Sequence, residues 1–137
     1  MAQILVIDDD ESIRFLLRTV LEFQGYDVIE AENGYEGLLC YQAEPADLVI
    51  TDMQMPVMDG LELIAELRRT FPRVKVIAIS GGRRTLEVAR TFTPHTFEKP
   101  FSLEEVLDTV QELVGASASS ELAYGAVAVA HSVQVTA

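Results

Sequence analysis

Short apolar runs rich in β-branched residues alternate along the chain with segments of helical periodicity, and this alternation constrains the fold most. The first run, residues 3–7 (QILVI), is apolar throughout, which is typical of a strand buried on both faces of a sheet. Further predicted strands follow at residues 27–31, 46–51, 74–80 and 95–98. Strict alternation with helices favours right-handed crossovers, so the sequence predicts a doubly wound α/β fold around a parallel sheet.

Local signals predict where the intervening helices begin. Side chains that accept a hydrogen bond from a free backbone N–H are favoured at these positions. The expected helix starts are Asp10 or Ser12, Asn33–Gly34, Gly60, residue 85 and Ser102. The last of these forms a capping-box pattern with Glu105 and opens a helix that we expect to end at residue 114.

The composition narrows the class of protein. The chain has 137 residues, 49% of them hydrophobic, which suits one globular domain. Its net charge of −12 argues against nucleic-acid phosphates or an anionic membrane as direct partners. The lone Cys40 favours a reducing compartment, and neither a signal peptide nor a membrane-spanning run is visible. We therefore expect a cytoplasmic protein.

Reactive side chains stand at the ends of four predicted strands. Asp8 and Asp9 follow the first strand, Asp52 the third, and Lys99 the fifth, while Ser80 ends the fourth. Ligands of an open α/β sheet bind outside the carboxyl ends of its strands, so we expect these groups at one edge. Taken singly, the first two acids could form a solvated turn, and the lysine could be an ordinary surface charge.

Taken together, these side chains indicate phosphoryl chemistry. Carboxylates within ~4–6 Å of one another repel unless a cation lies between them, and Mg²⁺ prefers such oxygen ligands. A carboxylate can act as a nucleophile when a metal ion and a lysine neutralise the transferred phosphoryl group. The sequence therefore predicts a Mg²⁺ site in which Asp52 is phosphorylated, with Ser80 and Lys99 contacting phosphoryl oxygens.

Four motifs, ILVIDDDESIRFLL, DLVITDMQMPVMDGLELI, VIAIS and FEKPF, resemble those of the receiver domains of two-component response regulators. The resemblance covers residues 3–114 and implies a flavodoxin-like (βα)₅ fold with strand order 2-1-3-4-5. It implies that Asp52 is the phosphoacceptor and that the metal binds Asp9, Asp52 and the backbone carbonyl of Gln54, with Asp8 acting through water. It also implies a cis peptide between Lys99 and Pro100.

The same resemblance implies a signalling role rather than that of an enzyme, although the domain would assist its own phosphorylation and dephosphorylation. The phosphoryl donor would be a histidine kinase or a phosphotransfer protein, and an unidentified protein effector would respond. The family's pattern further implies that Gln54 and Gly82 set the lifetime of the phosphorylated state. Both a monomer and a dimer remain open.

Two other classes of protein are weaker alternatives. Asp8-x-Asp10 has the form found in haloacid-dehalogenase phosphatases, which would make Asp8 the nucleophile of a phosphohydrolase, but that reading leaves Asp52 unexplained and lacks a cap domain. A transcription factor would need a DNA-binding unit, and residues 115–137 carry no basic stripe. We predict a receiver domain over residues 1–114 and a low-complexity tail over 115–137, of which residues 127–135 could instead pair as an edge strand.

The sequence departs from the family near the fifth strand. Receivers commonly carry an aromatic residue three positions before the lysine, where this chain has Thr96. The spacing from Ser80 to Lys99 is also shorter than in the family, which predicts a shortened fourth helix. Alternation along the strand predicts that Phe97 is buried and that Thr96 lies beside that helix. Output would then depend on the loop at Gly81-Gly82, with charges offered to an acidic partner by Arg83, Arg84 and Arg90.

Overall fold

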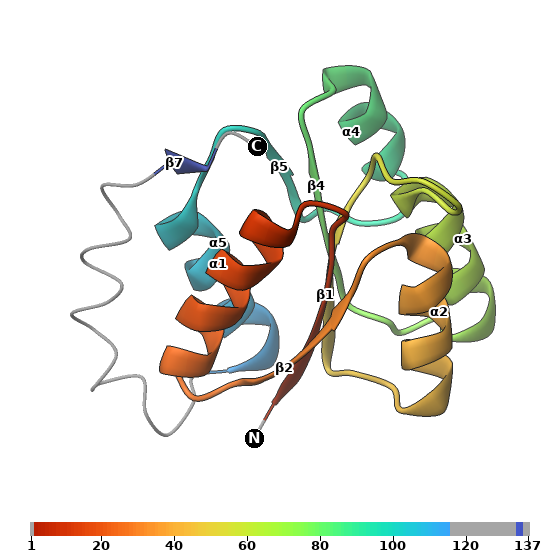
Figure 1. Ribbon diagram of the computed structural model, residues 1–137. Coiled ribbons are helices and arrows are strands. Elements are labelled where there is room, and N and C mark those ends of the chain that lie inside the picture. The colour runs from red at the N-terminus through yellow and green to blue at the C-terminus, as the bar shows by residue number, and fades with distance from the viewer. Residues whose placement is uncertain (1, 116–133, 136–137) are drawn as a thin grey trace.

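The computed structural model of the chain describes residues 2–115 and 134–135. Five parallel strands form one sheet in the order β2-β1-β3-β4-β5 (Figure 1). The strands are β1 (Gln3–Ile7), β2 (Asp27–Ala31), β3 (Leu48–Asp52), β4 (Val76–Ser80) and β5 (Thr96–Glu98). The helices are α1 (Glu11–Phe23), α2 (Gly34–Ala43), α3 (Gly60–Thr70), α4 (Arg83–Ala89) and α5 (Leu103–Val114). The predicted flavodoxin-like fold and its strand order are confirmed.

Helices cover both faces of the sheet because successive strand residues point to opposite sides. In β1, Ile4 and Val6 belong to the core shared with α1 and α5, whereas Leu5 and Ile7 belong to the core shared with α2 and α3. Figure 1 shows the same division, with α1 and α5 on one side of the sheet and α2, α3 and α4 on the other. The two cores hold the carboxyl ends of the central strands in a fixed array.

Side-chain caps fix where four of the helices begin. Asp10, rather than Ser12, caps α1, because its carboxylate accepts a hydrogen bond from the Ser12 backbone N–H at 2.8 Å. The caps of α2, α3 and α5 are Asn33, Asp59 and Ser102, and each accepts from the backbone N–H three residues further on. The predicted helix starts at these positions are confirmed.

The fourth helix is short, as predicted, but it begins at Arg83 rather than at residue 85. Its N-cap is Gly82, which makes no side-chain hydrogen bond. After the helix, Thr93 Oγ1 donates to the carbonyl of Val76 at 2.7 Å and fixes the chain against β4. The helix itself ends at Ala89, before the predicted end at residue 92, and β5 begins three residues after Thr93.

The end of α5 coincides with the predicted domain boundary. Gly115 follows with φ of 82°, a left-handed value that glycine adopts without strain. Of the predicted tail, residues 116–133 and 136–137 lie outside the described residues. Gln134–Val135 form β7, which pairs antiparallel with β6 (Phe101–Ser102), so at these two positions the chain does pair as a strand. None of the helices in the described ranges is long and apolar enough to cross a membrane.

Candidate functional site

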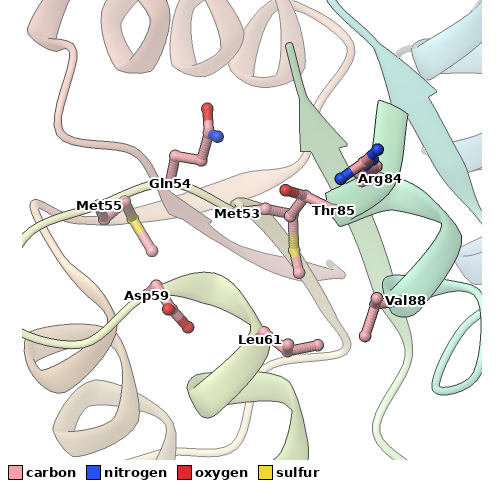
Figure 2. A pocket seen from close by; sticks show the side chains of 8 residues that line it. All are labelled: Met53, Gln54, Met55, Asp59, Leu61, Arg84, Thr85 and Val88. Carbon is pink, nitrogen blue, oxygen red and sulfur yellow. The ribbon is translucent and has the colours of Figure 1, made fainter. Parts of the chain in front are cut away.

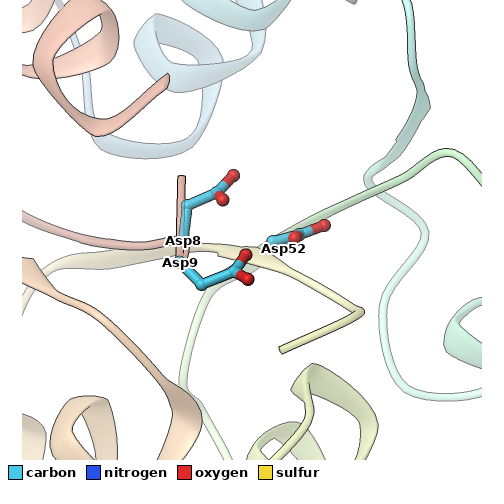
Figure 3. A group of neighbouring side chains, drawn as sticks. All are labelled: Asp8, Asp9 and Asp52. Atoms are coloured by element: carbon cyan, nitrogen blue, oxygen red, sulfur yellow. The ribbon is translucent and has the colours of Figure 1, made fainter. Parts of the chain in front are cut away.

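The carboxyl ends of β1 and β3 bring three acidic side chains together. Asp8 and Asp9 follow β1, and Asp52 is the last residue of β3. One carboxylate oxygen from each of the three lies within 4.8 Å of the others (Figure 3). The register of the two paired strands, in which Ile7 faces Thr51, places these acids side by side.

Lys99 places its ammonium group next to two of the carboxylates. Its Nζ atom is 3.5 Å from Oδ1 of Asp52 and 3.7 Å from Oδ2 of Asp8, and the side chain is 11% exposed. The Lys99–Pro100 peptide is cis, as the family resemblance implies. One ammonium among three carboxylates leaves a formal charge of −2 at this edge of the sheet, which suits a divalent cation.

The two inner carboxylates are shielded from water. Asp8 is 3% exposed and Asp52 is 6% exposed, whereas Asp9 faces solvent. Burial raises the pKa of Asp8 to about 6, and the charges of Asp52 and Asp9 add to this effect. Burial also raises the pKa of Asp52, but the Lys99 ammonium and two backbone N–H groups oppose the rise. A bound cation would strongly stabilise the ionised forms of carboxylates that are this crowded and poorly solvated.

Two further predicted site residues lie near Asp52: Ser80 ends the neighbouring strand β4, and Gln54 follows Asp52 by two positions. Ser80 is fully buried, and its Oγ accepts a hydrogen bond from the Gly82 backbone N–H at 3.0 Å, so its own hydrogen can be donated elsewhere. Gln54 lies in the loop after Asp52, and a Cβ placed on Gly82 would be 3.4 Å from Nε2 of Gln54. The two positions expected to set the lifetime of a phosphoryl group are therefore neighbours in space.

Two glycines pack the β3–α3 loop closely against the rest of the domain. A Cβ on Gly60 would overlap the carbonyl oxygen of Asp52, and one on Gly34 would overlap that of Met58. The Gly34 backbone N–H also donates to the Met58 oxygen at 3.0 Å. By contrast, a Cβ on Gly81 would meet nothing within 4 Å. The loop after β3 is thus tightly packed, while the loop after β4 has open space beside Gly81.

A groove of about 510 Å³ lies beside the acidic cluster, between the β3–α3 loop and α4 (Figure 2). Its lining is largely apolar, with charges only at Arg84 and Asp59; the other lining residues are Met53, Gln54, Met55, Leu61, Thr85 and Val88. None of the three clustered acids lines it. The sequence did not predict this groove, because its walls depend on how a loop and a helix pack.

Arg14 also escaped sequence reasoning, although it contacts the acidic pair. Its Nη1 atom donates to the backbone carbonyl of Asp8 at 2.6 Å, and the residue is only 9% exposed. The spacing with Leu17 and Leu21 placed Arg14 on the buried stripe of α1. A charged residue on such a stripe must find a partner, and this signal was available in the sequence.

The departures expected near β5 are present. Thr96 lies beside the end of α4, where its Oγ1 accepts a hydrogen bond from Nε of Arg90 at 3.2 Å. Phe97 packs against the core that includes α1 and α5. Its side chain is partly rather than fully buried, because β5 is an edge strand. The prediction for Phe97 had the right side of the sheet but overstated the burial.

Comparisons with known proteins agree with this geometry. The response regulator receiver domain matches residues 4–111. Sporulation initiation phosphotransferase F of Bacillus subtilis is 33% identical over 113 residues, which cover 80% of this chain and 91% of that protein. Transcriptional regulatory protein GlrR of Escherichia coli is 42% identical over 80 residues, which cover 58% of this chain but 18% of that protein.

Among solved structures, response regulator protein TrrA from Thermotoga maritima in complex with Mg(2+)-BeF has a TM-score of 0.77 and 33% identity. The likeness covers 83% of this chain and 100% of that one. These matches give no support to the haloacid-dehalogenase alternative with Asp8 as nucleophile.

Proposed function

Because the chain belongs to the response regulator receiver domain family, we propose that it accepts a phosphoryl group on Asp52 in a Mg²⁺-dependent reaction. Three acidic side chains with oxygens within 4.8 Å of one another, and Lys99 Nζ at 3.5 Å from Asp52, carry this proposal. The donor is a histidine kinase or a phosphotransfer protein, as suits a receiver domain. The protein is then a signalling phosphoacceptor rather than an enzyme with a substrate of its own.

The residues at the site fit a Mg²⁺ ion. Asp8, Asp9 and Asp52 supply carboxylate oxygens, and the backbone carbonyl of Gln54 would add a neutral oxygen. The formal charge of −2 is that of a site that a divalent cation neutralises. Bound there, Mg²⁺ would offset the negative charge of the transferred phosphoryl group.

The chain's own residues would divide the remaining work. An oxygen of the Asp52 carboxylate attacks phosphorus, and the nitrogen–phosphorus bond of the donor phosphohistidine breaks with its electron pair left on the imidazole. Lys99 favours the ionised, nucleophilic form of Asp52, because its ammonium opposes the rise in pKa that burial causes. Lys99 can then pair with one phosphoryl oxygen, and the Ser80 hydroxyl can donate to another.

A protein partner would read the phosphorylated state through the loop after β4. If Ser80 turns toward the phosphoryl group, its Oγ leaves the Gly82 N–H, and the start of α4 is released. Thr96 is too small to act as the aromatic switch that receivers commonly carry. The arginines of this region, Arg83, Arg84 and Arg90, would face an acidic surface on the partner. Both a monomeric and a dimeric receiver are compatible with this proposal. We propose a cytoplasmic location.

The receiver itself would comprise residues 1–114, and the tail over 115–137 would supply no ligand to the acidic site, although Gln134–Val135 pair with Phe101–Ser102 just beyond Lys99. The Tyr26 hydroxyl donates to the carbonyl of Gly115 at 2.8 Å, and Tyr26 directly precedes β2. The chain therefore leaves α5 at the amino ends of the strands, opposite to Asp52. A chain ending at Val114 should bind Mg²⁺ as tightly as the full chain.

Phosphorylation by acetyl phosphate, followed by mass spectrometry, tests the proposed function. We expect modification of the wild type only when Mg²⁺ is present, and none in Asp52→Asn. Asp27→Asn is a matched control, because Asp27 is an exposed acid at the opposite end of the sheet and should react like the wild type. Undiminished modification of Asp52→Asn would refute the assignment, and modification at Asp8 would favour a phosphohydrolase.

A further inference from the structure

Arg14 places a guanidinium group beneath the loop that carries the acidic pair. The residue is 9% exposed and shares the sheet-facing stripe of α1 with Leu17 and Leu21. A buried charge is costly unless it is paired and hydrogen-bonded, and an apolar side chain would fill the same stripe without this cost. Packing of the helix alone therefore does not explain why an arginine occupies this position.

Two groups hold the guanidinium from opposite sides. Nη1 donates to the backbone carbonyl of Asp8 at 2.6 Å, and Nε donates to Oε1 of Glu30 on β2 at 3.3 Å. The second oxygen of Glu30, Oε2, accepts from Nη1 of Arg18 at 2.7 Å. Glu30 thus compensates the charge of Arg14 and orients its planar fork, so that Nη1 points at Asp8.

The contacted carbonyl belongs to the peptide bond between Asp8 and Asp9. A peptide unit is planar, so fixing its oxygen fixes the plane that joins the two Cα atoms. Besides the capping bonds that Asp10 accepts from α1, this loop has a bond from Asp8 N to Ala31 O at 3.2 Å and one from Asp10 N to Asp8 Oδ1 at 2.9 Å. Neither of these bonds restrains the Asp8 carbonyl, and Arg14 supplies that restraint from α1.

We infer that Arg14 is a positioning residue: it holds the Asp8–Asp9 peptide in the orientation in which both side chains face Asp52. The inference rests on the proposed Mg²⁺ site. The inference predicts the direction in which Mg²⁺ affinity changes when Arg14 is replaced. By charge alone, removing a positive charge beside an acidic cluster would strengthen the binding of a cation. Loss of orientation weakens binding instead. The direction of the change therefore separates positioning from simple electrostatics.

Calorimetric titration of Mg²⁺ into the wild type, Arg14→Gln, Arg14→Lys and Arg18→Gln tests this role. We expect Arg14→Gln to bind about 10- to 100-fold more weakly, the range typical of residues that orient metal ligands. Arg14→Lys should recover part of the loss, because an ammonium can reach the carbonyl but cannot also hold Glu30 as a fork. Arg18→Gln removes a charge from the same Glu30 without touching Asp8, and should bind as well as the wild type or better.

Equal or tighter binding by Arg14→Gln would overturn the inference, as would an equal loss in Arg18→Gln. The amide resonance of Asp9 in the metal-free protein gives a second readout, because this N–H belongs to the held peptide. It should shift in Arg14→Gln but not in Arg18→Gln. If Arg14→Gln does not fold, Arg14→Lys, which keeps the positive charge, serves as the test. An Arg14→Lys variant with unchanged Mg²⁺ affinity and an unchanged Asp9 resonance would contradict the positioning role.

These readouts also separate the inference from the function on which it rests. A wild type that does not bind Mg²⁺ would contradict the proposed function. The Asp9 resonance of the metal-free variants would still decide whether Arg14 positions the acidic pair.

Discussion

The ammonium nitrogen of Lys99 lies 3.5 Å from Oδ1 of Asp52, which is the shorter of its two contacts with the acidic cluster. This contact lowers the pKa of Asp52 against the effect of burial. We expect Lys99→Met to raise the pKa values of Asp52 and Asp8 and to slow phosphorylation by acetyl phosphate at neutral pH. Carboxyl ¹³C titration by NMR measures the first effect.

Lys75→Met is the matched control for this substitution. Lys75 is the other lysine of the chain, and its Nζ donates to the carbonyl of Leu113 at 2.8 Å, away from the carboxylates. The pKa of Asp52 should be the same in Lys75→Met as in the wild type. A titration curve of Asp52 that does not move in Lys99→Met would contradict the role given to Lys99.

Asp8 should destabilise the metal-free protein at neutral pH. Its pKa of about 6 in the folded state exceeds the ordinary value of 3.8, so the folded protein binds this proton more tightly than the unfolded chain does. The ionised Asp8 carboxylate therefore lowers the free energy of unfolding. This destabilisation is fully present above pH 6 and is relieved as the pH falls from 6 toward 3.8. We expect Asp8→Asn to raise the free energy of unfolding at pH 7 by about 1–3 kcal/mol.

Urea denaturation without Mg²⁺ at pH 7 and at pH 5 checks this expectation. The gain from Asp8→Asn should be smaller at pH 5, where Asp8 is largely protonated in the folded wild type. The same variant should bind Mg²⁺ more weakly, because it lacks one charged ligand. If Asp8→Asn were less stable than the wild type at pH 7, the ionised Asp8 carboxylate would not be what destabilises the folded protein.

Gly82 and Gln54 should act on dephosphorylation together rather than independently. A Cβ at position 82 would stand 3.4 Å from Nε2 of Gln54, 3.3 Å from Oγ1 of Thr85 and 3.6 Å from Oγ of Ser80. A glutamate at position 82 would therefore contact the Gln54 side chain. We expect the effects of Gly82→Glu and Gln54→Ala on the dephosphorylation rate to be non-additive by about 0.5 kcal/mol or more, a factor of roughly two. Strict additivity in the double variant would refute the contact.

Val57 holds a backbone conformation that a β-branched residue rarely adopts. Its φ is 71°, and the Met58 N–H donates to the Pro56 carbonyl at 2.8 Å, which closes a γ-turn around it. The Val57 side chain is 80% exposed, so replacing it removes little packing. We expect Val57→Gly to raise the free energy of unfolding by about 1 kcal/mol and Val57→Ala by less, because alanine keeps Cβ. Equal stability of Val57→Gly and the wild type would mean that the turn carries no strain.

The sequence was sufficient for the fold and for the residues at the strand ends. Parallel strands meet at one edge, so the identity of the residue after each strand predicts that Asp8, Asp52 and Lys99 converge. The short α4 followed from the spacing between Ser80 and Lys99. These predictions succeeded because they rest on chain connectivity, which leaves few alternative arrangements.

Other features depend on packing that connectivity does not determine. The groove beside α4 exists only because the β3–α3 loop and α4 stop short of one another. The partial exposure of Phe97 depends on how far β5 is covered at the edge of the sheet. Arg14 was missed because an arginine on an amphipathic helix usually faces solvent, and its contact with Asp8 crosses from α1 to a loop.

The close packing at Gly34 and Gly60, set against the open space at Gly81, makes the domain mechanically asymmetric. On one side of Asp52 the backbone at Gly34 and Gly60 has no room for an added Cβ, so we expect α2 and α3 to keep their positions when a phosphoryl group is added. On the other side Gly81 has open space beside it, and we expect displacement of α4 to accommodate the phosphoryl group. The groove between the β3–α3 loop and α4 would then have one fixed wall and one movable wall, and its width would differ between the two states.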